Sequence, residues 1–204
     1  MYVGILTAPF GNASIDEIIK FAAEAGITGL EIAAGPGGHI DTNTFDQSEA
    51  DRIKDLLQKT GLKVSSLAHY TNTCDPAARE PYIKVIDAAV MLGTDVVCGM
   101  AGFPVDGKSK MDTIRQDVPK AYRPILDHAK DKGIKIALEN WFATNIQHFG
   151  HWDAIFEEIP DEHFGLNYDP SHLIWQGIDY LGGVERYKDR IFHTHAKDTE
   201  MKEE

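Results

Sequence analysis

The sequence predicts a barrel of parallel β-strands that alternate with α-helices, a (β/α)8 barrel. Three observations lead to this prediction. Short runs of β-forming residues alternate with longer amphipathic runs, and a glycine follows most of the amphipathic runs. Successive strands also begin about 31 residues apart, which is the spacing of a barrel that takes about 250 residues for eight units. Strands separated by helices in this way run parallel, with right-handed crossovers.

The individual elements follow from this alternation. The predicted strands are residues 2–7, 27–33, 62–69, 94–99, 134–139, 163–169 and 191–197. The predicted helices are residues 14–25, 46–60, 76–92, 111–132, 148–159 and 179–187. Ser14 and Glu17 have the spacing of a capping box at the start of the first helix. Glycines that fit the left-handed position at helix ends follow four of the helices: Gly26, Gly61, Gly93 and Gly133.

The predicted strands use almost the whole chain, so an eighth strand and helix have no room. We therefore expect residues 1–204 to form a single (β/α) barrel domain that is incomplete at its C-terminus. A fragment of a longer protein is favoured over a barrel that stays open or is completed by another chain. A doubly wound open sheet is the alternative architecture. It is disfavoured because TAPFGN follows the first strand, where a dinucleotide-binding fold carries a GxGxxG loop.

The composition argues against several classes of protein. The chain has 204 residues, 20 basic and 32 acidic side chains and a net charge of −12. Nucleic acid and anionic membranes are therefore poor partners, since both require a basic surface. No apolar run approaches the roughly 20 residues of a transmembrane helix, and no basic segment precedes the first apolar run. Two cysteines are too few for a disulfide framework, and we expect a cytoplasmic protein.

Acidic and histidine residues gather at the ends of three successive predicted strands. In a (β/α) barrel, the carboxyl ends of the strands form the active face. Glu139 ends the fifth strand, Asp169 ends the sixth and His195 lies in the seventh. Two carboxylates and an imidazole suit a divalent metal ion such as Mn²⁺, Mg²⁺, Co²⁺ or Zn²⁺. Singly, Glu139 could be a solvated loop residue, Asp169 a helix cap and His195 a residue facing the helices, but their joint occurrence favours a metal site.

Three motifs resemble those of a known superfamily. They are ALEN at residues 137–140, NYDPSHL at residues 167–173 and HTHAKD at residues 193–198. Similar motifs occur in the xylose isomerase-like TIM barrels, which include sugar isomerases, ketose 3-epimerases and inosose dehydratase-type enzymes. The resemblance covers nearly the whole chain, because the strand period and the position of each motif both fit.

The resemblance implies roles for individual residues. Glu139, Asp169 and His195 would bind the metal ion, and His172 would contact the substrate or a metal-bound ligand as part of the catalytic group. The family's fourth ligand is a glutamate on strand eight, which has no counterpart in this sequence. The glutamates that follow the seventh strand lie too close to it to replace that ligand: Glu200, Glu203 and Glu204. We therefore expect an incomplete site.

The chemistry implied is proton transfer beside a carbonyl group. A divalent ion that chelates neighbouring hydroxyl and carbonyl oxygens stabilises an enediolate while a proton leaves the adjacent carbon. Glu139 would be one of the two carboxylates that move the proton. The resemblance thus implies a metal-dependent isomerase or epimerase whose substrate is a small sugar or cyclitol. The sequence leaves the oligomeric state open, including a homo-oligomer.

Three other functions stay open. The first is a lyase or dehydratase on the same scaffold, in which the enediolate expels a β-substituent. The second is a multi-zinc endonuclease of the same superfamily. It is disfavoured because it needs a histidine at the end of the fourth strand, where VVCGMAGF stands, and a basic groove. The third is a sugar-binding or scaffold protein without catalysis, which the missing eighth strand keeps open.

Four side chains are further candidates for substrate binding. His69 stands at the end of the third strand, and His172 shares this role. Lys197 could neutralise a negatively charged substrate oxygen, and a surface ion pair of little energy is the alternative. Trp175 could pack on the apolar face of a sugar, and core packing is the alternative. Glu31 could accept hydrogen bonds from sugar hydroxyls.

Overall fold

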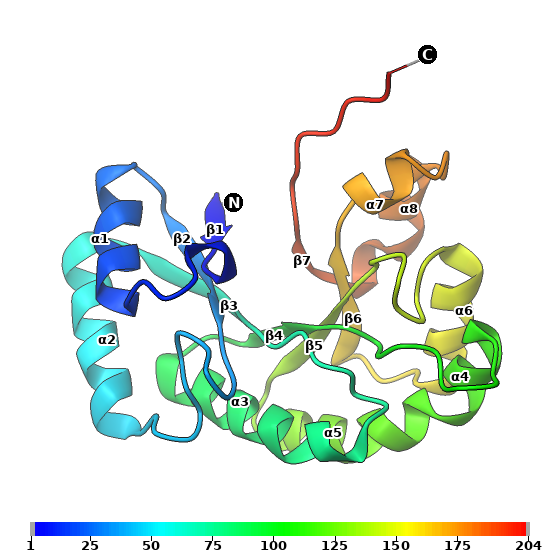
Figure 1. Ribbon diagram of the computed structural model, residues 1–204, viewed down its shortest axis with the longest axis horizontal. Helices are drawn as coiled ribbons and strands as arrows, with labels where there is room; N and C mark the ends of the chain where they lie inside the picture. The colour runs from blue at the N-terminus through cyan, green and yellow to red at the C-terminus, as the bar shows by residue number, and fades with distance from the viewer. Residues whose placement is uncertain (1–2, 203–204) are drawn as a thin grey trace.

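The computed structural model describes residues 3–202 and contains one parallel β-sheet of seven strands. The strands lie in chain order, and each pairs in parallel with the next. They are β1 (Gly4–Leu6), β2 (Gly29–Ala33), β3 (Lys63–Ala68), β4 (Val96–Gly99), β5 (Lys135–Glu139), β6 (Phe164–Tyr168) and β7 (Ile191–Thr194). The sheet curves into an open barrel (Figure 1). A doubly wound sheet would reverse its strand order at a switch point, so this order confirms the barrel architecture.

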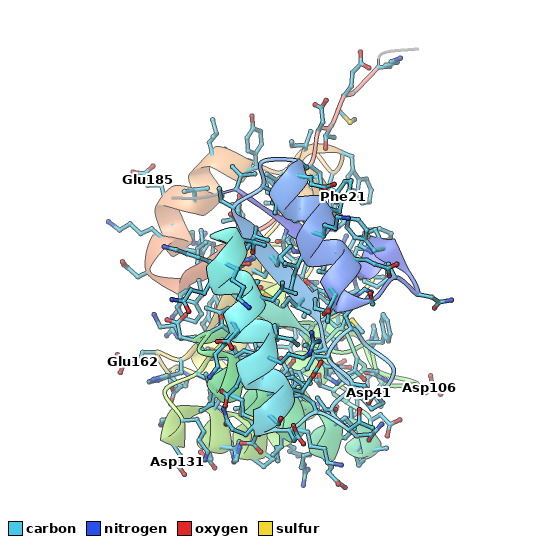
Figure 2. The ribbon with its side chains drawn as sticks, turned by 90° about the vertical axis from the view of Figure 1, so that its left-hand side faces the viewer. Phe21, Asp41, Asp106, Asp131, Glu162 and Glu185 are labelled. Carbon is cyan, nitrogen blue, oxygen red and sulfur yellow. The ribbon has the colours of Figure 1, made fainter. Side chains whose placement is uncertain are left out.

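The helices join successive strands and cover the outer side of the sheet (Figure 1). They are α1 (Ile15–Glu24), α2 (Gln47–Thr60), α3 (Arg79–Leu92), α4 (Lys110–Gln116), α5 (Val118–Asp131), α6 (Phe149–Glu158), α7 (Ser171–Ile174) and α8 (Tyr180–Tyr187). Short 3₁₀ turns are η1 (Ala8–Phe10), η2 (Pro76–Ala78) and η3 (Lys188–Arg190). Figure 2 shows α1 and α2 side by side in front of the sheet. Within residues 3–202, none of the helices combines the length and the apolar character needed to cross a bilayer.

Caps and glycines set the helix ends as the sequence predicts. The Ser14 hydroxyl accepts a hydrogen bond from the Glu17 N–H at 3.3 Å, and the Glu17 carboxylate accepts one from the Ser14 N–H at 2.8 Å. These two bonds form the predicted capping box. The four helix-ending glycines have positive φ angles of 72°, 74°, 78° and 70°, in chain order. This left-handed backbone favours glycine because a Cβ would crowd the following carbonyl oxygen.

The structure corrects three details of the predicted elements. The helix expected over residues 111–132 is two helices, α4 and α5, with a break at Asp117. The break follows from Pro119, which lacks an N–H and whose ring would clash with the preceding turn of a continuous helix. The sequence does not predict α7. The last strand ends at Thr194, so His195 and Lys197 follow the strand instead of belonging to it. The predicted start of the first strand, at residue 2, lies outside the described residues.

The two faces of the sheet have different partners. Large apolar side chains fill the layer between sheet and helices, and the largest of those fully buried are Trp152, Tyr82, Tyr122 and Phe164. A smaller buried cluster consists of Val96, Cys98 and Ala137. These residues alternate along β4 and β5 with members of the larger cluster, so they lie on the inner face of the sheet. The apolar core therefore lies mainly outside the strands, and the inner face is free to carry polar side chains.

Gly133→Ala tests whether a helix-ending glycine contributes through the backbone alone. An added Cβ at Gly133 would meet no atom within 4 Å, so no side-chain clash complicates the result. We expect the free energy of unfolding to fall by about 1 kcal/mol, which is the cost of the left-handed backbone for a residue with a Cβ. Urea denaturation measures the change. Lys132→Ala, one residue earlier at a φ of −101°, is the control, and equal unfolding energies for the two variants would contradict the expectation.

Candidate active site

Three of the predicted residues meet at the carboxyl edge of the sheet. Glu139 is the last residue of β5, Asp169 directly follows β6, and His195 directly follows β7. The Nδ1 atom of His195 lies 3.3 Å from Glu139 Oε1 and 3.9 Å from Asp169 Oδ2. Because β5, β6 and β7 are adjacent parallel strands, their ends bring together side chains that are as much as 56 residues apart in the sequence.

His172 joins this group from α7, the short helix that follows β6. Its Nε2 atom lies 3.4 Å from Glu139 Oε1 and 3.5 Å from Asp169 Oδ2. Glu139, Asp169 and His172 each offer one potential ligand atom, and these atoms lie within 4.8 Å of one another. We call Glu139, Asp169, His172 and His195 the strand-end cluster. Its side chains are at most 16% exposed, so its charges are largely shielded from solvent.

Hydrogen bonds from neighbouring residues fix Asp169 in position. Its Oδ1 atom accepts hydrogen bonds from the Ser171 N–H at 2.9 Å and the Ser171 hydroxyl at 2.5 Å. These bonds occupy Oδ1 at the start of α7, while Oδ2 faces the cluster. The buried Asn140 side chain donates to the Asp169 carbonyl at 2.9 Å and accepts from the Asp169 N–H at 2.7 Å. This pair of bonds ties the end of β5 to the end of β6.

Lys197 places its ammonium group against the two carboxylates of the cluster. Its Nζ atom contacts Asp169 Oδ2 and lies 3.5 Å from Glu139 Oε1. Burial disfavours the charged amine, but the hydrogen bond and charge of Asp169, together with Glu139, outweigh this effect and raise the pKa of Lys197. The space between the carboxylates therefore attracts a cation, which is the property that a metal site of oxygen and nitrogen donors requires.

His195 lies between carboxylates on both sides of its ring. Its Nε2 atom is 2.8 Å from Glu31 Oε2, and its Nδ1 atom faces Glu139. Burial favours the neutral imidazole, but the hydrogen bonds to Glu139 and Glu31 outweigh it and raise the pKa of His195 to about 10. Burial also acts to raise the pKa of Glu139, but hydrogen bonds from His172 and His195 outweigh it and lower that pKa overall.

Glu31 reaches His195 from β2 as part of a buried hydrogen-bond chain. It is 3% exposed, and its Oε1 atom accepts a hydrogen bond from the Tyr70 hydroxyl at 3.0 Å. The Tyr70 oxygen accepts from the Asn167 amide at 3.0 Å, and the Asn167 carbonyl lies 3.1 Å from His193 Nδ1. Both oxygens of Glu31 thus have protein partners, and the sugar contact suggested by the sequence stays a prediction.

Tyr70 and Asn167 are site residues that the sequence analysis did not single out. Tyr70 comes directly after the predicted third strand, and Asn167 opens the NYDPSHL motif. Their positions at strand ends were therefore visible in the sequence. What the sequence does not show is the direction in which each side chain points.

His69 lines a groove of about 590 Å³ together with Tyr70 and Asn72, and no member of the strand-end cluster lines this groove. Its Nδ1 atom donates to the Ala34 carbonyl at 2.8 Å. Burial lowers the pKa of His69, which favours the neutral ring. Its Nε2 atom is buried and has no hydrogen-bond partner among the described residues. Nε2 is then an acceptor, able to take a hydrogen bond from a hydroxyl group.

Trp175 borders the cluster through an aromatic contact. Its ring is 46% exposed and packs edge-on against Phe142, with 5.2 Å between ring centroids. Phe142 in turn lies 6.3 Å from the ring of His172. Trp175 is therefore a surface residue beside the cluster, whereas the alternative predicted from the sequence was burial in the core.

A second group of potential ligands lies on the inner face of the sheet. Glu31, Cys98 and His193 offer atoms within 4.8 Å of one another. Burial strongly raises the pKa of the Cys98 thiol, so it stays protonated. The Glu31 oxygens contact Tyr70 and His195, and His193 contacts Asn167 and two serine hydroxyls. These polar atoms are already satisfied by protein partners, and the group contains one carboxylate, whereas the strand-end cluster contains two that repel each other.

Sequence comparison identifies relatives of this chain. A family model described as "Xylose isomerase-like TIM barrel" matches residues 19–204. YfiH of Bacillus subtilis (strain 168), an uncharacterised protein, is 26% identical over 232 aligned residues, covering 98% of this chain and 74% of YfiH. An inosose dehydratase of Clostridium perfringens (strain ATCC 13124) is 30% identical over 185 residues, covering 89% of this chain. The chain spans 54% of the length of that dehydratase.

Solved structures share the fold. A probable 3-DHS dehydratase, AsbF of Bacillus anthracis, superposes with a TM-score of 0.80 at 18% identity, covering 96% of this chain and 72% of AsbF. D-psicose 3-epimerase of Clostridium cellulolyticum H10 gives a TM-score of 0.78 at 18% identity with the same coverage. The IOLI protein, described with a bound zinc atom, gives 0.75 at 18% identity, covering 98% and 74%. At these identities the likeness shows the fold.

The pH dependence of stability tests the charge balance around His195. Its folded-state pKa of about 10 lies above the ordinary value of 6.5. Its contribution to stability is therefore complete below pH 6.5 and is lost as the pH rises toward 10. With a chelator present, we expect the free energy of unfolding to fall over this range, and to fall less in His195→Gln. Urea denaturation at several pH values measures both, and an NMR titration that places the His195 pKa near 6.5 would contradict the expectation.

Proposed function

This chain belongs to the xylose isomerase-like TIM-barrel family, and on that premise we propose that it is a metal-dependent enzyme that isomerises or epimerises a sugar or cyclitol. The observation that carries the proposal is the strand-end cluster. Its two carboxylates and two imidazoles converge at the carboxyl edge of the sheet, where (β/α) barrels have their active sites. The shared fold of D-psicose 3-epimerase supports a carbohydrate substrate.

Glu139, Asp169 and His195 are the proposed ligands of a divalent ion. Carboxylate oxygens and imidazole nitrogens suit Mn²⁺, Mg²⁺, Co²⁺ and Zn²⁺, and the zinc atom described for the IOLI protein supports zinc as one candidate. When bound, such an ion supplies Lewis-acid chemistry by polarising the carbonyl and hydroxyl oxygens of a substrate. The attraction of Lys197 to the same carboxylates supports a cation at this place.

Glu139 is the proposed proton acceptor. Its carboxylate is ionised at neutral pH, as a proton acceptor must be, but the hydrogen bonds that lower its pKa also make it a weaker base. A bound ion would offset this by polarising the carbonyl group and making the neighbouring C–H more acidic. His172 Nε2, 3.4 Å from Glu139 Oε1, is placed to bind the substrate oxygen next to that carbon. Glu139 and His172 would therefore act on neighbouring atoms of one substrate.

Three other side chains are proposed to bind the substrate. Lys197 is half exposed beside the cluster and would offset negative charge on a substrate oxygen. Trp175, with Phe142, offers an aromatic surface for the apolar face of a sugar ring. The free acceptor of His69 would receive a hydrogen bond from a hydroxyl group.

A dehydratase is the second candidate, favoured by the 30% identity to an inosose dehydratase. In this reaction Glu139 would again remove the proton beside the carbonyl. The hydroxyl group on the next carbon would then leave with a proton as water, and a carbon–carbon double bond would form. The same side chains therefore support either outcome, and the substrate decides whether a hydroxyl group leaves or a proton returns to the carbon.

Glu139→Gln tests the role of the carboxylate. In the complete enzyme, the substitution keeps the volume but removes the charge and the proton acceptor, so we expect turnover to fall by about 10²- to 10⁴-fold. The measurement is turnover of a panel of ketoses, aldoses and inososes with each divalent ion. Circular dichroism checks the fold. Glu24→Gln, an exposed carboxylate on α1, should keep wild-type turnover, and similar rates for both variants would refute the assignment.

The ion dependence and the products separate the two candidate reactions. A chelator should abolish turnover, because the substrate oxygens would lose their Lewis acid. Adding back a divalent ion should restore turnover. Epimerisation gives products without new ultraviolet absorption. Dehydration gives an unsaturated carbonyl product that absorbs in the ultraviolet. Turnover that survives the chelator would exclude both candidates in their metal-dependent form.

A further inference from the structure

We propose that Glu31 is a positioning residue that fixes the tautomer and orientation of His195 for ion binding. This inference rests on the proposed function, in which His195 is a metal ligand. It assigns Glu31 a role that differs from the sugar contact suggested by the sequence. The juxtaposition that carries it is the 2.8 Å contact between Glu31 Oε2 and His195 Nε2, on the far side of the ring from Glu139 and Asp169.

The hydrogen-bond directions around Glu31 place a proton on His195 Nε2. A carboxylate only accepts hydrogen bonds, so the Tyr70 hydroxyl donates to Oε1 and His195 Nε2 donates to Oε2. With its own proton given to Glu31, the Tyr70 oxygen accepts from the Asn167 amide. The Asn167 carbonyl then accepts from His193 Nδ1. The Asn167 amide nitrogen also lies 3.1 Å from His195 Nε2. The Glu31 carboxylate is closer, at 2.8 Å, and only accepts, so it assigns the proton to Nε2.

The proton on Nε2 determines whether the other ring nitrogen of His195, Nδ1, has a lone pair available to bind an ion. Without an ion, Nδ1 also carries a proton, which it shares with Glu139. If an ion displaced that proton, the ring would keep its proton on Nε2 and have its lone pair on Nδ1. In this structure Nδ1 is the atom that faces Glu139 Oε1, at 3.3 Å, and Asp169 Oδ2, at 3.9 Å. Glu31 thus directs the lone pair of His195 toward the two carboxylates with which it would share an ion.

Burial makes Glu31 suitable for this task. It is 3% exposed, and its partner Tyr70 holds the other carboxylate oxygen, so the carboxylate has little freedom to turn away. His195, by contrast, follows the end of β7, and the one backbone hydrogen bond of its N–H within residues 3–202 is to the Tyr168 carbonyl. The orientation of the His195 ring therefore depends on side-chain partners. Partners of this kind raise metal affinity by about 10- to 100-fold.

Zinc affinity of Glu31 variants tests the proposal without relying on catalysis. Competition with a chromophoric chelator measures the zinc Kd of the full chain. We expect Glu31→Ala to raise the Kd by about 10- to 100-fold and Glu31→Gln to raise it less. The glutamine carbonyl still accepts from Nε2, but it lacks the negative charge. Tyr70→Phe, which frees Oε1, should give a smaller increase and provides a second measurement if Glu31→Ala does not fold.

Asp87→Asn is the matched control, because Asp87 forms a carboxylate–histidine pair with His128 at 2.8 Å between α3 and α5, outside the strand-end cluster. It should leave the zinc Kd unchanged. Long-range ¹H–¹⁵N spectra of the zinc-loaded wild type should show His195 protonated at Nε2 and metal-bound at Nδ1, with the signal assigned by its loss in His195→Gln. A purely structural role for Glu31 would not predict this tautomer.

The possible outcomes separate this proposal from the proposed function. If Glu139→Gln loses zinc binding while Glu31→Ala and Glu31→Gln keep the wild-type Kd, the metal site stands and the role of Glu31 is refuted. A spectrum with zinc on His195 Nε2 also refutes it. If the wild type and Glu139→Gln bind zinc equally, the metal site itself fails, and the role of Glu31 fails with it.

Discussion

Two like charges held at one edge of the sheet are the constraint on which the rest of the site depends. Glu139 and Asp169 offer oxygens within 4.8 Å of each other, and carboxylates this close repel unless a cation or hydrogen-bond donors lie between them. The surrounding side chains meet this need. Lys197, His172 and His195 all point toward the pair, and Ser171 donates to the far oxygen of Asp169. In a chain with a net charge of −12, this concentration of basic groups stands out.

The parallel sheet determines where these groups lie, and short polar contacts determine how they point. Adjacent strands deliver Glu139, Asp169 and His195 to one edge, but strand ends alone leave side chains free to turn toward solvent. The reciprocal bonds between Asn140 and Asp169 remove that freedom for the β5 and β6 ends. On the β7 side, Glu31 and Tyr70 provide the corresponding restraint. The strands therefore set the positions of the site residues, and side chains elsewhere in the sequence, such as Asn140 and Glu31, set their orientations.

This division explains what could be predicted from the sequence. The strand and helix order follows from local alternation and from glycines such as Gly61, and the positions of Glu139 and Asp169 follow from the strand ends. The break at Asp117 was not predicted. Pro119 lies next to it, but Pro124 lies inside α5 without ending that helix, so a proline alone does not show where a helix breaks. The sequence did not show that Glu31 contacts His195. His195 lies 164 residues away, and only the curvature of the sheet brings β2 and β7 close enough for contact.

That separation of 164 residues also affects how the protein folds. Contacts between groups so distant along the chain carry a large loop-closure cost and form late. Partly folded states in which β7 has not yet docked would hold Glu139 and Asp169 without His195, and would bind an ion weakly. An ion that prefers the finished arrangement stabilises it by mass action. The bound ion would then hold β7 against β5 and β6, coupling the docking of the last strand to the assembly of the site.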